Sequence, residues 1–177
     1  MRRIVVAAAL LFATAAVASL RADEPPKPEA AKTTSATYMI SGLHCSMCSG
    51  TVERSLSKVP GVRAIKVDFN TKMAKIDFDE AKVPAERVSQ LIAATPHMMT
   101  GMNLHYDGWL TLKAPDLKDD ASAKVAKDAL GKVAGVKSVA TFPDKHIVEI
   151  QFGTDGKATS AELIDALGQA GIKAENF

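Results

Sequence analysis

Hydrophobic and polar positions follow two alternating periods along most of the chain, and the period changes at turn residues. From Tyr38 onward the pattern predicts a short strand, a helix ending at Pro60-Gly61, a two-strand hairpin and a second helix. A fourth strand is predicted where Met102, Leu104 and Tyr106 alternate with polar residues. This order of elements is β-α-β-β-α-β, in which a hairpin separates two helices.

The same pattern occurs a second time. Leu56–Phe78 aligns without gaps on Leu130–Phe152, at a constant shift of 74 positions, and apolar residues and Gly recur at matching places. The second copy starts with a strand at Leu110 and Leu112 and ends with a strand from Ile172. The sequence therefore predicts an α+β fold of two tandem ferredoxin-like βαββαβ domains, 37–107 and 108–177. Each is expected to have an antiparallel four-stranded sheet with two helices on one face.

The first 36 residues lack this pattern and predict export. Arg2 and Arg3 precede an alanine-rich apolar stretch, and small residues suited to cleavage follow it. Residues 1–22 are therefore interpreted as a signal peptide, with an uncleaved anchor as the alternative. The proline-rich stretch 23–36 has no large apolar side chain and is expected to be a disordered linker. The mature chain is expected to have no membrane span and to be periplasmic or secreted.

Composition and charge narrow the function. With 22 basic and 20 acidic residues in 177, the chain has a formal charge of +2, and removal of 1–22 takes away three arginines and no acidic residue. A near-neutral chain without a basic block predicts no nucleic-acid partner. No nucleophile–base set and no pair of carboxylates stands out in the sequence, so we expect no enzyme.

The two cysteines are the clearest chemical signal. Cys45 and Cys48 are separated by two residues, which is too short a loop to staple a fold. They lie where the first strand meets the first helix, and a helix N-terminus favours thiolates. Two soft sulfurs suit Cu(I) better than Zn(II), which normally takes four ligands. A thiol–disulfide redox protein and an inert disulfide are the alternatives.

Two motifs around the first helix carry a resemblance to a known family. They are Gly42-Leu43-His44-Cys45-Ser46-Met47-Cys48, before the helix, and Pro60-Gly61-Val62 with the following hairpin, after it. This part of the chain resembles the heavy-metal-associated domain of copper chaperones, periplasmic mercury-binding proteins and metal-pumping ATPases. Leu43 replaces the Met of the family pattern Gly-Met-x-Cys-x-x-Cys, and a core Leu of similar volume is expected to be tolerated. The resemblance implies metal ligation by Cys45 and Cys48. Cu(I) is the expected ion, and Zn(II) and Hg(II) are the other candidates. It also implies a protein donor or acceptor of the metal.

A second group of sulfur and imidazole side chains is expected near the cysteines. Six residues, 95–100, are extra relative to the second copy, and strand order places them at the cysteine end of the sheet. Thioethers and imidazoles are soft or borderline ligands, and some Met residues simply fill gaps. The candidate auxiliary ligands are His44, Met47, His97, Met98 and Met99.

The second copy has no sulfur at its matching loop. Asp119, Asp120 and Ser122 occupy it and are expected to cap the helix that follows. The second domain is therefore interpreted as a degenerate copy that serves as scaffold or docking surface. The function that the sequence predicts is an exported metal carrier or sequestration protein. A protein-interaction module with a secondary metal site is a further alternative.

Overall fold

The computed structural model describes residues 33–97, 104–154 and 157–177. The first half of the chain forms β1 (Thr33–Ser41), α1 (Ser46–Leu56), β2 (Val62–Asp68), β3 (Met73–Asp79) and α2 (Ala85–Ala93). After these come β4 (Asp107–Lys113), α3 (Asp120–Leu130), β5 (Val136–Phe142), the short 3-10 helix η1 (Pro143–Lys145), β6 (Ile147–Phe152), α4 (Ser160–Gln169) and β7 (Glu175–Asn176). The order confirms the expected α+β fold with two ferredoxin-like repeats.

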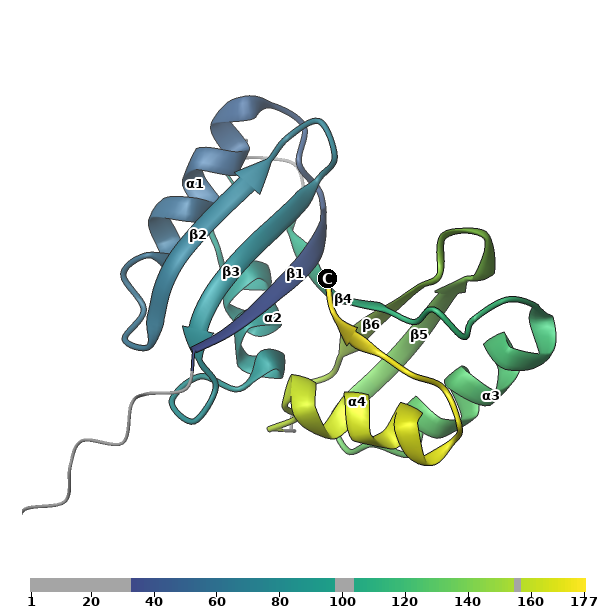
Figure 1. Cartoon of the computed structure of the whole chain (residues 1–177). Helices are drawn as coiled ribbons and strands as arrows, with labels where there is room; N and C mark the ends of the chain where they lie inside the picture. Colours follow the sequence, from purple (N-terminus) through teal and green to yellow (C-terminus); the bar gives the residue numbers. More distant parts are fainter. Residues whose placement is uncertain (1–32, 98–103, 155–156) are drawn as a thin grey trace, which may run out of the picture.

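One strand belongs to both repeats. The strands run in the order β2-β3-β1-β4-β6-β5, and β7 also pairs with β4. Residues 107–111 of β4 pair antiparallel with β1, whereas residues 110–113 pair antiparallel with β6. β4 is thus the last strand of the first unit and the first strand of the second. Figure 1 shows it lying between the two sheets, with α1 and α2 on one unit and α3 and α4 on the other.

The predicted fourth strand at Met102, Leu104 and Tyr106 is wrong. Residues 104–106 are described and are not in a strand, and the pairing partner of β1 is β4 instead. The reason is that Leu110 and Leu112 both have fully buried side chains, so one strand satisfies the hydrophobic alternation of both repeats. The expected division between residues 107 and 108 therefore falls inside β4.

Two other predicted bounds differ from the structure. β1 begins at Thr33, so the last four residues of the stretch expected to be a linker are in a strand. Their backbone continues the antiparallel register with β3, in which Thr33 lies opposite Asp79. The final strand, β7, covers only Glu175–Asn176 rather than starting at Ile172.

The core lies between each sheet and its helices. Ala36, Tyr38 and Ile40 of β1 are fully buried, as are Ile76 and Phe78 of β3. These residues alternate along their strands, so they share one face of the sheet. From the helices, Val52 and Leu56 of α1, Val88 and Ile92 of α2, Leu130 of α3, and Leu163 and Leu167 of α4 are fully buried.

Two carboxylates of the first unit also hold the second. Glu80 accepts hydrogen bonds from the backbone N–H of Ser160, at 2.5 Å, and from its hydroxyl, at 3.1 Å. The fully buried Glu86 accepts one from the backbone N–H of Ala158, at 3.2 Å. Ser160 is the first residue of α4, where backbone N–H groups lack partners within the helix, and Ala158 lies just before the N-cap Thr159.

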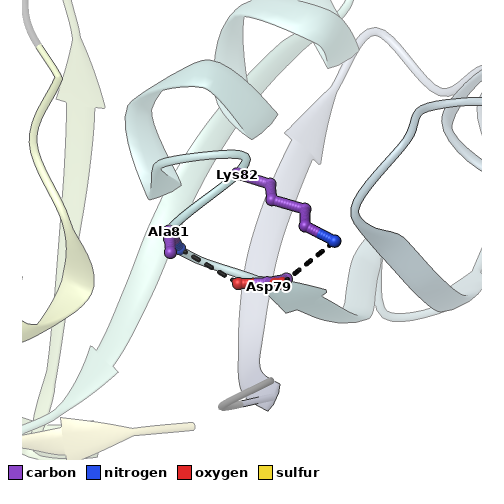
Figure 2. Close-up of polar contacts among 3 residues, drawn as sticks. All are labelled: Asp79, Ala81 and Lys82. Atoms are coloured by element: carbon purple, nitrogen blue, oxygen red, sulfur yellow. Dashed lines mark hydrogen bonds and ion pairs between the residues drawn. The ribbon is translucent and has the colours of Figure 1, made fainter. Parts of the chain in front are cut away.

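The loop that presents Glu80 is itself braced. Figure 2 shows the Asp79 carboxylate accepting a hydrogen bond from the backbone N–H of Ala81, at 3.3 Å, and pairing with the Lys82 ammonium, at 3.6 Å. The Asp79 side chain is nearly buried, whereas that of Lys82 is mostly exposed. These contacts fix the conformation of the turn between β3 and α2, which carries Glu80.

Some of the predicted features lie outside the described residues. These are the proposed signal peptide, residues 23–32 of the proposed linker, and Met98, Met99 and Met102. Within the described ranges, no helix combines the length and the apolar character needed to cross a bilayer.

Candidate metal-binding site

The loop between β1 and α1 begins at Gly42, whose backbone conformation and close neighbours disfavour any side chain. Gly42 has φ +82°, a left-handed conformation that costs other residues energy. A Cβ at this position would lie 2.3 Å from the carbonyl oxygen of His105. Leu43, which follows, is buried in the core, as expected for a replacement of the family Met. The loop is therefore pressed against the segment that precedes β4.

Cys45 and Cys48 lie at the start of α1. Cys45 is the N-cap residue, and the backbone N–H of Cys48 donates to the Cys45 carbonyl oxygen at 3.1 Å. Their Sγ atoms are 3.1 Å apart, and both cysteines are free. The first turn of α1 contains no acidic residue, so the positive end of the helix dipole faces the sulfurs uncompensated. The structure thus brings the two predicted ligands together.

The two thiols have different surroundings. The side chain of Cys48 is fully buried, whereas Cys45 is partly exposed. Burial is the largest single influence on the Cys48 thiol and raises its pKa. Hydrogen bonding from the Cys45 and Tyr106 side chains and from the backbone at His44 and Cys45 outweighs it and lowers the Cys48 pKa to about 7. Cys48 therefore reaches the thiolate form, the form that binds metals, near neutral pH.

Tyr106 is a site residue that the sequence analysis did not identify. Its side chain is fully buried, and its hydroxyl interacts with the Cys48 thiol. Burial, followed by the hydrogen bond and charge of Cys48, raises the pKa of Tyr106 well above its ordinary value, so the phenol stays protonated. The sequence placed Tyr106 inside a strand. The signal that could have found it is its place just before β4, at the same end of the sheet as the cysteines.

His97 and His44 lie beside this group. The His97 ring is 4.8 Å from the Tyr106 ring and 5.8 Å from the His44 ring, measured between centroids. His97 Nε2 is 3.2 Å from the Gly42 carbonyl oxygen, so the ring also braces the cysteine loop. The Met47 side chain, on the first turn of α1, is 66% exposed. Two of the candidate auxiliary residues, His44 and His97, are thus close together at the cysteine end.

The second unit has a capping box where the first has cysteines. Asp119 is the N-cap of α3, with φ −152° and ψ 177°, and Cys45 has nearly the same backbone conformation, with φ −153° and ψ 163°. The Asp119 side chain accepts from the Ser122 backbone N–H, and the Ser122 hydroxyl interacts with the Asp119 backbone N–H in return. This confirms the expected capping role. The positions that hold sulfur in one unit stabilise a helix in the other.

Within the described parts of the chain, no group of three or more His, Cys, Asp or Glu side chains is arranged to hold a metal ion. Among the described residues, the site contains two sulfurs with a hydroxyl and two imidazoles nearby. A ferredoxin-like fold with a dithiol at the start of its first helix defines a class of small domains that bind heavy metals through paired soft ligands.

Comparisons with known proteins agree with this class. Residues 37–97 match the heavy-metal-associated domain. The chain is 36% identical over 80 residues to the mercuric transport protein periplasmic component of Serratia marcescens, covering 45% of this chain and 82% of that protein. It is 26% identical over 132 residues to the copper-transporting ATPase HMA5 of Oryza sativa subsp. japonica, covering 74% of this chain and 13% of the ATPase. The chain belongs to the heavy-metal-associated domain family and is a heavy-metal-binding protein.

The chain also matches solved structures of other proteins. The water-soluble region of the P-type ATPase CopA from Bacillus subtilis gives a TM-score of 0.41 at 18% identity, covering 82% of this chain and 92% of that one. Oxidized MerP from Ralstonia metallidurans CH34 gives a TM-score of 0.37 at 30% identity, covering 45% of this chain and 97% of that one.

Proposed function

We propose that the mature chain is an exported carrier or sequestration protein for a soft metal ion, which Cys45 and Cys48 bind as thiolates. The observation that carries the proposal is the pair of free Sγ atoms, 3.1 Å apart, at the N-terminus of α1. The low pKa of Cys48, about 7, supports it, because the metal then displaces few protons at neutral pH.

Cu(I) is the ion that we favour. Cu(I) is soft and accepts two thiolate ligands, whereas Zn(II) normally requires four. With a metal–sulfur bond of about 2.3 Å, a linear S–metal–S unit needs sulfurs about 4.6 Å apart. The two sulfurs must therefore separate on binding. Cys48 is fixed in the core and Cys45 is partly exposed, so the Cys45 side chain is the one that is free to move outward.

Hg(II) is the second candidate, and a specific observation favours it. Hg(II) is also soft and is satisfied by two thiolates. Several relatives that match most of their own length are mercuric transport proteins, with 35–38% identity in the bacterial proteins from Pseudomonas aeruginosa and Alcaligenes. The same relatives are named as periplasmic components, which supports our proposal that this chain is exported to the periplasm.

The redox alternative is less well supported by the site. A thiol–disulfide reaction needs an accessible attacking thiolate. Here the thiol with the lowered pKa, Cys48, is fully buried. An interaction module remains the role that we propose for the second unit, whose surface is independent of the cysteines. The donor or acceptor of the metal is a protein that reaches the exposed side of the Cys45 loop.

The test is native mass spectrometry of the reduced mature protein with equal amounts of Cu(I), Hg(II) and Zn(II). We expect one Cu(I) per chain, with Hg(II) as the main competitor and Zn(II) weakly retained. The Cys45→Ser/Cys48→Ser variant is the control. A wild-type protein that stays metal-free with reductant present would show that the proposal is wrong.

The auxiliary ligands are a separate prediction. If His44, Met47, His97, Met98 and Met99 contribute, the Cys45→Ser/Cys48→Ser variant should keep weak Cu(I) binding, because imidazole and thioether ligands survive the loss of both thiols. A competition titration against a Cu(I) chelator measures this. Adding His44→Ala and His97→Ala should then weaken the residual binding further, because only the thioether ligands remain. Complete loss of binding in the double Ser variant would contradict an auxiliary role.

A further inference from the structure

The two edge strands of the sheet differ in the contact that each receives from its neighbouring helix. β2 is the edge strand of the first unit, and Glu53 of α1 accepts a hydrogen bond from the backbone N–H of Val67 at 2.7 Å. Val67 lies opposite Ala74 of β3, and its N–H is directed to the helix rather than into the ladder. An unpaired strand edge is a template for another strand. The Glu53 side chain therefore closes part of the β2 edge.

The second unit has the same arrangement of helix and edge strand without this carboxylate. Thr141 of the edge strand β5 lies opposite Val148, which is the register position that Val67 has in the first unit. The helices α1 and α3 are related by the same shift of 74 positions, which places Lys127 where α1 has Glu53. An ammonium group donates hydrogen bonds and cannot accept one. The contact that closes the β2 edge therefore has no counterpart from this position of α3.

A hollow of about 400 Å³ lies between α3 and β5, where the carboxylate is missing. Thr141 lines it from the strand, and Lys124 and Lys127 line it from the helix, together with Asp120 and Asp128. The two lysines are exposed and three positions apart, so they lie on the same face of α3. At the position that corresponds to Glu53 the hollow is therefore positively charged, beside a backbone donor.

We propose that the β5 edge is a docking site for an extended acidic segment of a partner protein, whose carboxylate takes the place that Glu53 has in the first unit. This inference deepens the docking role proposed for the second unit and rests on that role. The segment adds as a strand along β5, so main-chain hydrogen bonds supply the affinity. Its carboxylate accepts from the Thr141 N–H and pairs with Lys127, and hydrogen bonds to a charged acceptor are stronger than those to a neutral one.

The test is a titration of the isotope-labelled mature protein, followed through its amide NMR resonances. The probes are two capped heptapeptides that differ in one residue, Thr-Val-Thr-Glu-Thr-Val-Thr and Thr-Val-Thr-Lys-Thr-Val-Thr. We expect the Glu peptide to shift the Thr141 resonance in a saturable way. It should bind at least about tenfold more tightly than the Lys peptide, as for a hydrogen bond to a charged group. Val67, at the edge that Glu53 closes, is the internal control and should not shift.

Lys127→Glu is the variant that separates this site from a general surface effect. It reproduces the arrangement of Glu53 in α3, so it should slow hydrogen exchange at the Thr141 amide and abolish binding of the Glu peptide. Lys132→Glu is the matched control, because it makes the same change of charge at an exposed position after the end of α3. This control should bind the Glu peptide as the wild type does.

The inference is overturned if the wild type shows no saturable shift, if the two peptides bind equally, or if Lys127→Glu binds like the wild type. A wild type that dimerises through β5 in sedimentation experiments, and a Lys127→Glu variant that does not, would identify a second copy of the chain as the occupant and would also overturn it. Metal binding is measured on the same samples. Its absence would refute the proposed carrier function and leave the peptide result standing, so the two failures are distinguishable.

Discussion

Cys45 and Cys48 share a motif but have different physical roles. Cys48 is a fully buried residue of the core with a thiol pKa near 7, whereas Cys45 is the partly exposed N-cap of α1. In the proposed metal site, Cys48 would be the fixed ligand, and Cys45 would be the ligand that a partner protein reaches first. A transfer that proceeds by ligand exchange should begin at Cys45.

The lowered pKa of Cys48 predicts a pH dependence. A thiol whose folded pKa lies below its unfolded value stabilises the fold above the unfolded pKa, and this stabilisation is lost as the pH falls through the folded value of about 7. The metal-free wild type should therefore lose stability, relative to Cys48→Ser, as the pH is lowered from 9 to 6. Chemical denaturation at several pH values measures this, and a constant difference between the two proteins would contradict it.

Single residues were predicted from the sequence only where their chemistry is specific. The cysteine pair stands out because two thiols at this spacing have few structural uses, and the structure brings them together. Tyr106 was missed because a tyrosine in an alternating apolar pattern is indistinguishable from a core residue in a strand. Its significance comes from the close contact of its backbone with Gly42, which no local pattern encodes.

At the scale of the elements, α1 and α3 begin in the same way with different chemistry. Cys45 and Asp119 are both N-caps with an extended backbone, and Cys48 and Ser122 both lie three residues further on. In α3 the capping box satisfies backbone N–H groups at the helix start. In α1 the Cys45 side chain makes no capping hydrogen bond. The first unit therefore gives up helix-capping energy to present sulfur.

This equivalence predicts that a second site can be installed. Asp119→Cys/Ser122→Cys should place two thiols at the start of α3 with the backbone already in the conformation seen at Cys45, and native mass spectrometry should then find two soft metal ions per chain. The matched control, Asp119→Ala/Ser122→Ala, should bind one. Both variants should lose about 1 kcal/mol of stability with the capping box. One ion in the cysteine variant would contradict the equivalence.

The turn before α1 gives a further prediction. Gly42→Ala forces a side chain into a left-handed conformation and against the His105 carbonyl oxygen, so it should cost at least about 1–2 kcal/mol and weaken Cu(I) binding. Gly50→Ala is the control, since Gly50 lies in α1 and a Cβ there meets nothing within 4 Å. It should stabilise the protein by up to about 1 kcal/mol and leave binding unchanged. Thermal unfolding and a Cu(I) titration of both variants check this.

Elements with a clear period were predicted correctly, and the junction was not. The α1 helix, the hairpin of β2 and β3, and their repeats in α3, β5 and β6 follow from the apolar spacing. The prediction for the junction between the repeats was wrong because it assigned each repeat a separate strand. Whether one strand can pair with two neighbours depends on which edges meet in space, and Leu110 lies opposite both Tyr38 of β1 and Ile150 of β6.

For the whole molecule, the shared strand couples the two units. β4 supplies buried side chains to both cores, and Glu80 and Glu86 bind the start of α4 from the other unit. A family domain limited to residues 37–97 excludes β4 and would lack one strand of its own sheet. The first unit thus needs β4, the strand that it shares with the second unit, to complete its sheet.

Unfolding should accordingly be a single transition. Leu110→Ala removes a fully buried side chain of the shared strand and should cost about 2–5 kcal/mol. It should also shift the unfolding of both units together, which hydrogen exchange at β3 and at β6 would report. Val125→Ala, on the exposed surface of α3, is the control and should have little effect. Two separate transitions in the wild type would contradict this coupling.

The fusion also has a consequence for self-association. Two independent four-stranded sheets would offer four edge strands, and each unpaired edge is a template for adding a strand from another molecule. In the described part of this chain, only β2 and β5 remain as full-length edges, and β2 carries the exposed charged residues Arg63, Lys66 and Asp68. Joining the repeats through β4 therefore leaves fewer unpaired strand edges at which another molecule could add a strand, which favours a dispersed protein.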